Sequence, residues 1–90
     1  MLVVWKYAIP MADRFDQELP FGAKVLCVQM QSHTPEMWVL VESSEDRHEI
    51  RQFRLAGTGH EIESSDCHLY IGTFQLREGA LVFHLFETQT

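Results

Sequence analysis

The chain has 90 residues, of which 46% are hydrophobic and 22% charged, so we expect one domain over residues 1–90 with a single core and no deep interdomain cleft. The net charge of −6 argues against nucleic-acid binding, which relies on clustered Lys and Arg. No apolar run suits a membrane span or a signal peptide, and two cysteines do not make a disulfide framework. A cytoplasmic protein is therefore expected.

Short apolar runs, separated by Gly, Pro, Ser and acidic residues, predict a series of strands joined by tight turns. In chain order the expected strands are 2–9, 15–19, 24–32, 37–42, 48–55, 69–76 and 80–87. The second is ambiguous, because Phe15 and Leu19 are also spaced for one helical turn. The pattern predicts an all-β fold, a small antiparallel sandwich or a partly open barrel of five to seven strands.

The last two strands are predicted to form a hairpin closed by a three-residue loop, 77–79, with Gly79 in the left-handed conformation. The resulting register places Gly72 opposite His84. Both sides of this hairpin are apolar, so we expect a second sheet to cover one side and a second copy of the chain, in a homodimer, to cover the other. In the competing arrangement, the loop 56–68 folds over the second side.

A glycine-spaced loop, Gly57-Thr58-Gly59-His60, is the best candidate for a small-ligand site, because its backbone N–H groups could bind an anion. Acidic residues follow it, whereas a phosphate loop normally leads into a helix. The alternative is a tight connection with no ligand. His84 likewise is either an imidazole available to a ligand or a core residue.

Catalysis is not predicted, since the chain has neither a nucleophile elbow nor an HExxH motif. Pairing of His60 with Cys67 or Glu61 keeps a small hydrolase among the alternatives. His60, Cys67 and His68 lack the paired spacing of structural zinc ligands, so we expect no metal and no cofactor.

Several motifs spread along nearly the whole chain carry a resemblance. They are Trp5-Lys6-Tyr7, residues 19–29 from Leu19-Pro20-Phe21-Gly22 onward, Met37-Trp38-Val39-Leu40-Val41, Gly57-Thr58-Gly59-His60, Tyr70-Ile71-Gly72-Thr73-Phe74-Gln75 and residues 79–87. Together they resemble a family of short uncharacterised proteins encoded by bacteriophages and prophages. The resemblance implies a phage origin and a host-cell cytoplasm, and it assigns no catalytic residue.

These observations lead to the hypothesis of a small phage-type accessory protein that binds a host or phage macromolecule, with a protein as the expected partner, and performs no chemistry. One alternative is a small-ligand or nucleotide-binding protein, or a small hydrolase, that uses the Gly57–His60 loop. The other is a minor component of the virion or of its assembly.

Overall fold

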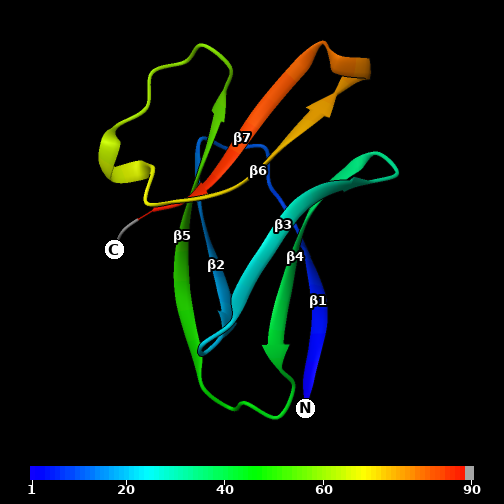
Figure 1. The fold of residues 1–90 in the computed structure, drawn as a ribbon, viewed down its shortest axis with the longest axis vertical. Helices are drawn as coiled ribbons and strands as arrows, with labels where there is room; N and C mark the ends of the chain where they lie inside the picture. Colours follow the sequence, from blue (N-terminus) through cyan, green and yellow to red (C-terminus); the bar gives the residue numbers. More distant parts are fainter. Residues whose placement is uncertain (89–90) are drawn as a thin grey trace.

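The strands expected from the sequence are present in the computed structural model, which describes residues 1–88 (Figure 1). These residues form seven strands: β1 Leu2–Ala8, β2 Arg14–Pro20, β3 Lys24–Gln31, β4 Thr34–Glu42, β5 His48–Gly57, β6 Leu69–Leu76 and β7 Leu81–Glu87. The helical segments in the described part of the chain are two three-residue 3-10 turns, η1 Ser64–Asp66 and η2 Arg77–Gly79, and neither could cross a membrane. The predicted all-β fold is confirmed, and the ambiguous second segment is a strand.

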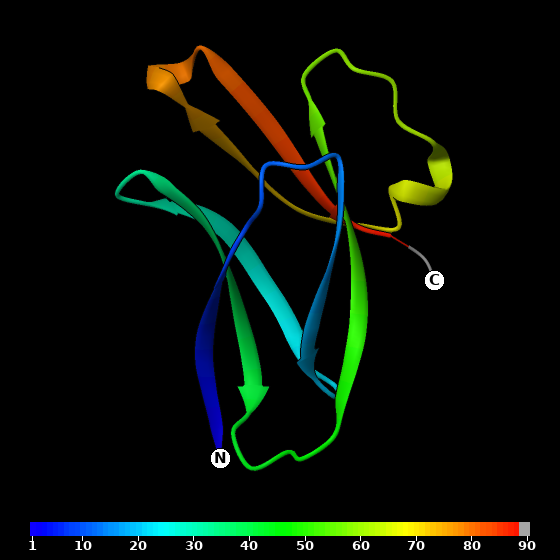
Figure 2. The same ribbon diagram turned by 180° about the vertical axis from the view of Figure 1, so that it is seen from behind.

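The strands form two open antiparallel sheets that pack as a sandwich (Figures 1 and 2). Sheet A has the order β1-β4-β3, and sheet B has the order β2-β5-β7-β6. Alternation along each strand sends every second side chain into the space between the sheets. The largest fully buried side chains lie there: Leu19, Met37, Val39, Val41, Phe53 and Leu85.

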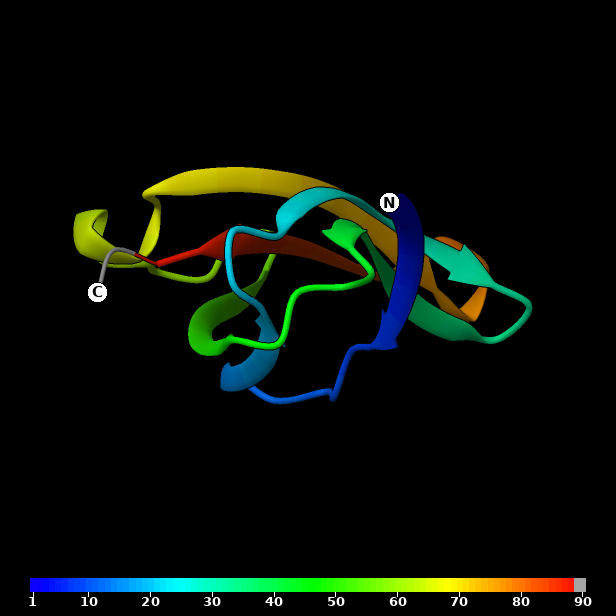
Figure 3. The same cartoon turned by 90° about the horizontal axis from the view of Figure 1, so that it is seen from below.

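The two sheets approach each other most closely where β3 and β6 lie side by side, as the view from below shows (Figure 3). Gly72 of β6 lies against Val28 of β3 at this crossing. The predicted placement of Gly72 opposite His84 is wrong, because Thr73 is the residue opposite His84. Gly72 therefore accommodates the other sheet rather than a histidine.

The register of the last hairpin differs from the prediction because its loop has four residues, so that Leu76 pairs with Leu81. The backbone of Gly79 has a φ of 91°, which confirms the predicted left-handed conformation. Arg77 and Glu78 also have positive φ values, 51° and 56°. Two consecutive non-glycine residues with positive φ are uncommon, and neither an arginine nor a glutamate side chain predicts this conformation from the sequence.

The apolar side chains of β7 are largely covered within the single chain. Leu85 is fully buried, Phe83 packs against the core, and the Phe86 ring lies 5.5 Å from the Tyr70 ring. Leu81 is the large apolar residue of this strand that remains exposed, at 39%. The broad apolar patch that led us to predict dimerisation through β7 is therefore absent from this strand.

Candidate functional site

The predicted glycine loop is a tight turn at the end of β5. The amide of His60 donates a hydrogen bond to the Gly57 carbonyl at 3.1 Å, and Gly59 has a φ of 87°. The His60 ring lies against Gly57, where an added Cβ would be 3.0 Å from the ring. Gly57, Thr58 and His60 line a shallow cavity of about 220 Å³ together with residues 80–83. Both glycines thus have a steric or conformational role in the turn.

The loop meets β7 and β6 through a chain of polar side chains on the outer face of sheet B. Thr58 Oγ1 lies 2.7 Å from His84 Nε2, and Thr73 Oγ1 lies 2.9 Å from His84 Nδ1. The Tyr70 hydroxyl extends the chain, 2.6 Å from Thr73 Oγ1. A neutral imidazole donates from one nitrogen and accepts at the other, so the two threonine hydroxyls satisfy both nitrogens of His84.

Of the residues predicted for this site, the structure brings Thr58 and His84 into direct contact. Gly57, Gly59 and His60 shape the neighbouring turn and cavity. Sequence reasoning missed Thr73, because the predicted register placed it on the opposite side of the hairpin from His84. The arrangement places two threonine hydroxyls around an imidazole whose nitrogens are both engaged, so a polar ligand would have to replace one of these contacts.

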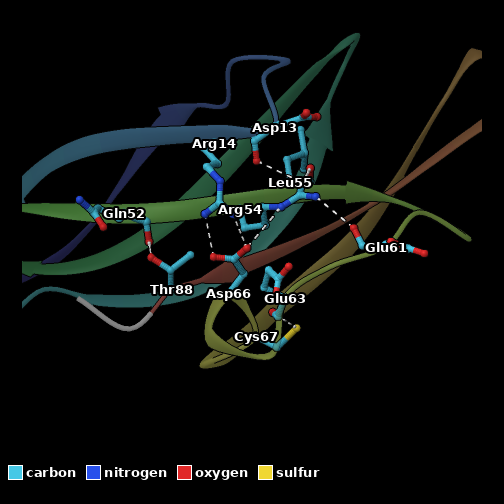
Figure 4. Close-up of polar contacts among 10 residues, drawn as sticks. All are labelled: Asp13, Arg14, Gln52, Arg54, Leu55, Glu61, Glu63, Asp66, Cys67 and Thr88. Atoms are coloured by element: carbon cyan, nitrogen blue, oxygen red, sulfur yellow. Dashed lines mark hydrogen bonds and ion pairs between the residues drawn. The ribbon is translucent and has the colours of Figure 1, made fainter.

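A second polar cluster joins the loop between β5 and β6 to the outer face of sheet B (Figure 4). Asp66, in η1, accepts two hydrogen bonds from the Arg14 guanidinium, at 2.7 and 2.5 Å, and its carboxylate lies 3.8 Å from Arg54 Nε. Arg54 also donates to the carbonyls of Leu55 and Glu61, at 2.5 and 3.4 Å. The loop is thereby attached to both β2 and β5.

This cluster has the properties of a structural clamp. The Asp66 side chain is only 7% exposed, and hydrogen bonds from Arg14 hold the pKa of its carboxyl below its usual range. The cavity beside it, of about 520 Å³, is also lined by Glu61 and Glu63. Asp66 already engages two N–H groups of the Arg14 guanidinium and offsets its charge, which disfavours the binding of an anion there. Sequence reasoning missed this contact, because Asp66 and Arg14 are 52 residues apart.

Within residues 1–88, no group of three or more His, Cys, Asp or Glu side chains could hold a metal ion. Cys27 and Cys67 are both free thiols and are half-buried. Cys67 Sγ contacts the Glu63 carbonyl at 3.6 Å.

The outer face of sheet A carries an apolar surface that sequence reasoning did not single out. Met37, Val39 and Val41 point into the core, so the alternate residues of β4 point outward. The strand register places them beside outward residues of β1. We define the outer patch as these four residues: Leu2, Val4, Trp38 and Leu40.

Sheet B covers only the inner face of sheet A, and the outer patch remains accessible. Leu2 is 63% exposed and Val4 is 52% exposed, whereas Trp38 and Leu40 are half-buried by their strand neighbours. Lys6 is paired with Trp38, and Lys24 is paired with Leu40. The surface therefore has an apolar centre with charged residues at its margin.

Comparison with known proteins gives one match. A family model described as Domain of unknown function (DUF7352) matches residues 1–90, the whole chain. The chain belongs to this family. No curated protein and no solved structure matches it.

Membership of the DUF7352 family agrees with the predicted resemblance in one respect, that the family has no assigned activity. The match carries no evidence of a phage origin. The function of this DUF7352 domain has to be inferred from its surfaces, of which the outer patch and the Thr58–His84 chain are the two candidates.

Proposed function

We propose that this domain is a small accessory protein that binds a protein partner through the outer patch and performs no chemistry. The observation that carries the proposal is the exposure of Leu2 and Val4 beside Trp38, on a sheet face that sheet B does not cover. A cluster of exposed apolar side chains on a small domain is typical of an interaction site. Trp is also among the residues that contribute most to protein interfaces.

The margin of the outer patch specifies the chemistry of the partner. Lys6 and Lys24 lie on β1 and β3, and Glu42 pairs with Leu2 at the end of β4. An apolar centre with a mixed charged rim fits a protein surface of the same construction. Two lysines do not form a phosphate-binding surface on a chain with a net charge of −6.

The proposed setting of this function is the cytoplasm of a host cell, for a protein encoded by a phage or prophage. Support for that setting comes from the motif resemblance alone. The partner is then a host or phage protein.

Capture of partners from host lysate tests the proposal when two matched variants accompany the wild-type bait. Leu40→Glu introduces a charge into the outer patch beside Lys24, on the central strand of sheet A. Ile50→Lys introduces a charge at another exposed apolar side chain, 56% exposed and paired with Glu18. Each new charge faces an opposite one, so both variants should fold.

We expect one stoichiometric protein to be retained by the wild type and by Ile50→Lys, and to be lost with Leu40→Glu. Titration of the purified pair should show the same order of affinities. Equal retention by all three baits, or by none, would contradict a binding role for the outer patch.

Small-ligand binding is a second candidate, favoured by the contact of Thr58 and His84 beside the cavity under His60. Titration with inorganic phosphate, and separately with a nucleotide, would test it by NMR. Shifts confined to the amides of residues 57–60 and to the His84 ring, abolished by His84→Phe, would support a ligand site. Unchanged spectra at millimolar concentrations would count against it.

A further inference from the structure

Two open sheets have four edge strands, and three of these edges carry features that prevent pairing with another chain. The edges β3 and β6 each contain a register shift of the kind that marks a β-bulge, and they lie against each other. On the edge β2 the first, third and fifth residues are charged and the last is a proline. These residues are Arg14, Asp16, Glu18 and Pro20.

The fourth edge, β1, lacks such features. Its sequence, Leu2–Ala8, contains no proline, its pairing with β4 has no bulge, and it has one charged residue. The ammonium of that residue, Lys6, donates to the Gln31 side chain on β3, across sheet A, so it leans away from the edge. In Figures 1 and 2 no other strand runs alongside β1 on the side away from β4.

The hydrogen bonds at the two ends of β1 show which backbone groups face outward. The Met1 carbonyl accepts from Ser43, and the Ile9 amide donates to Pro35. In an antiparallel strand the N–H and C=O of one residue point to the same side, and the side alternates along the chain. Odd-numbered residues of β1 therefore face β4, and the even-numbered residues, Leu2, Val4, Lys6 and Ala8, present their backbone groups to a new strand.

We infer that β1 pairs antiparallel with β1 of a second copy, on a two-fold axis through Trp5. Hydrogen bonds between the copies form only where an even-numbered residue of one copy faces an even-numbered residue of the other. The numbers of each facing pair then have an even sum, so the two-fold axis passes through a residue and not between two residues. An axis at Lys6 would place two ammonium groups opposite each other, which is destabilising. An axis at Val4 would place Tyr7 opposite Met1, outside β1, and leave Ala8 without a partner in β1, whereas an axis at Trp5 pairs the whole strand.

The side chains fit this register. Trp5 faces Trp5 of the second copy, in a non-hydrogen-bonded pair with Cα atoms about 4.5 Å apart. Val3 faces Tyr7, an aromatic and β-branched pair of the kind that stabilises sheets. Trp5 is 42% exposed in the single chain although it shares the inner face with Val39 and Val41, and the second Trp5 would cover it.

The pairing joins two three-stranded sheets into one of six strands, with the two outer patches adjacent on the same face. It therefore adds to the proposed function, because a partner protein would meet a surface twice as large. The predicted homodimer is retained, and its interface moves from β7 to β1.

Sedimentation of the full chain tests the pairing with two matched proline variants. Val4→Pro removes one outward-facing N–H group of β1 and leaves every hydrogen bond between β1 and β4 in place. The control is Glu18→Pro on β2. The Phe21 amide donates to the Arg47 carbonyl and the Asp13 carbonyl accepts from the Leu55 amide of β5, so the even-numbered residues of β2 again face outward. At tens of micromolar we expect twice the chain mass of 10.5 kDa for the wild type and for Glu18→Pro, and a single-chain mass for Val4→Pro.

A cysteine pair tests the register directly, in a background with Cys27 and Cys67 changed to Ser. Trp5→Cys places two thiols across the axis, within disulfide distance, whereas Leu2→Cys places them roughly 20 Å apart, six residues of strand. Oxidation should cross-link Trp5→Cys and leave Leu2→Cys uncoupled.

A monomeric wild type, or equal cross-linking of both cysteine variants, would overturn the inference. Such a result is separable from failure of the proposed function, because Leu40→Glu lies on the central strand and leaves the β1 edge intact.

Discussion

Gly72 of β6 lies so close to Val28 of β3 that a Cβ on residue 72 would be 2.8 Å from Val28 Cγ1. The same Cβ would be 3.5 Å from the Val28 backbone nitrogen, so the main chains of the two sheets also come close together at this point. The absence of a side chain at residue 72 is what allows the edges β3 and β6 to meet.

We predict that Gly72→Ala destabilises the domain by about 1–3 kcal/mol, because the stiff Val28 side chain must move from its rotamer. Denaturant unfolding monitored by tryptophan fluorescence measures the change. The double variant Gly72→Ala, Val28→Ala should lose less stability than the sum of the two single variants. Additive losses would mean that residues 28 and 72 are not in contact.

Two substitutions in the loop between β6 and β7 are predicted to change the stability of the domain in opposite directions. Gly79→Val should cost about 1–3 kcal/mol, because a β-branched residue is strained at a φ of 91°. Glu78→Gly should raise stability by up to about 1 kcal/mol, since it relieves the strain of a non-glycine residue at a φ of 56°. Thermal unfolding of both variants checks this, and a destabilised Glu78→Gly would contradict the described loop.

Asp66→Asn should loosen the loop between β5 and β6 while leaving the sandwich folded. The substitution weakens the ion pair with Arg14, which holds η1 against sheet B. Hydrogen exchange of the amides in residues 58–68 should rise several-fold, with the core strands unchanged. Glu61→Gln is the control, because the backbone carbonyl of Glu61, and not its side chain, bonds Arg54. Equal exchange in both variants would argue against the clamp.

The stability that the Asp66–Arg14 clamp gives to the loop should decrease at acid pH. Asp66 has a lowered pKa in the folded protein, chiefly through its hydrogen bonds from Arg14. A group with a lowered folded pKa contributes stability above its unfolded pKa and loses it as the pH falls through the folded value. Loop protection should therefore be constant near neutral pH and fall as the pH drops from the usual titration range of aspartate down through the lowered folded value. In Asp66→Asn this acid-dependent step should be absent.

Local patterns were sufficient to predict the elements of this fold. The apolar run 37–42, the alternation in 48–55, and turn residues such as Pro20 and Gly22 report on short-range preferences that the tertiary structure retained. The left-handed Gly79 was predictable for the same reason, because conformational freedom belongs to the residue itself.

Register and long-range contacts were not predictable in this way. A loop of four residues rather than three moved every partner in the last hairpin by one position, until the shift at Ile71 again paired Tyr70 with Phe86. The one extra residue in the loop is the reason that Thr73, and not Gly72, lies opposite His84.

The sequence by itself determined an all-β chain with its strands and most of its turns, because those depend on neighbouring residues. Only the tertiary structure decided that Asp66 binds Arg14, that Gly72 admits Val28, and that β1 is left as an open edge. Each of these depends on which strands become neighbours in space, and that choice is made by the packing of the whole core rather than by any one segment.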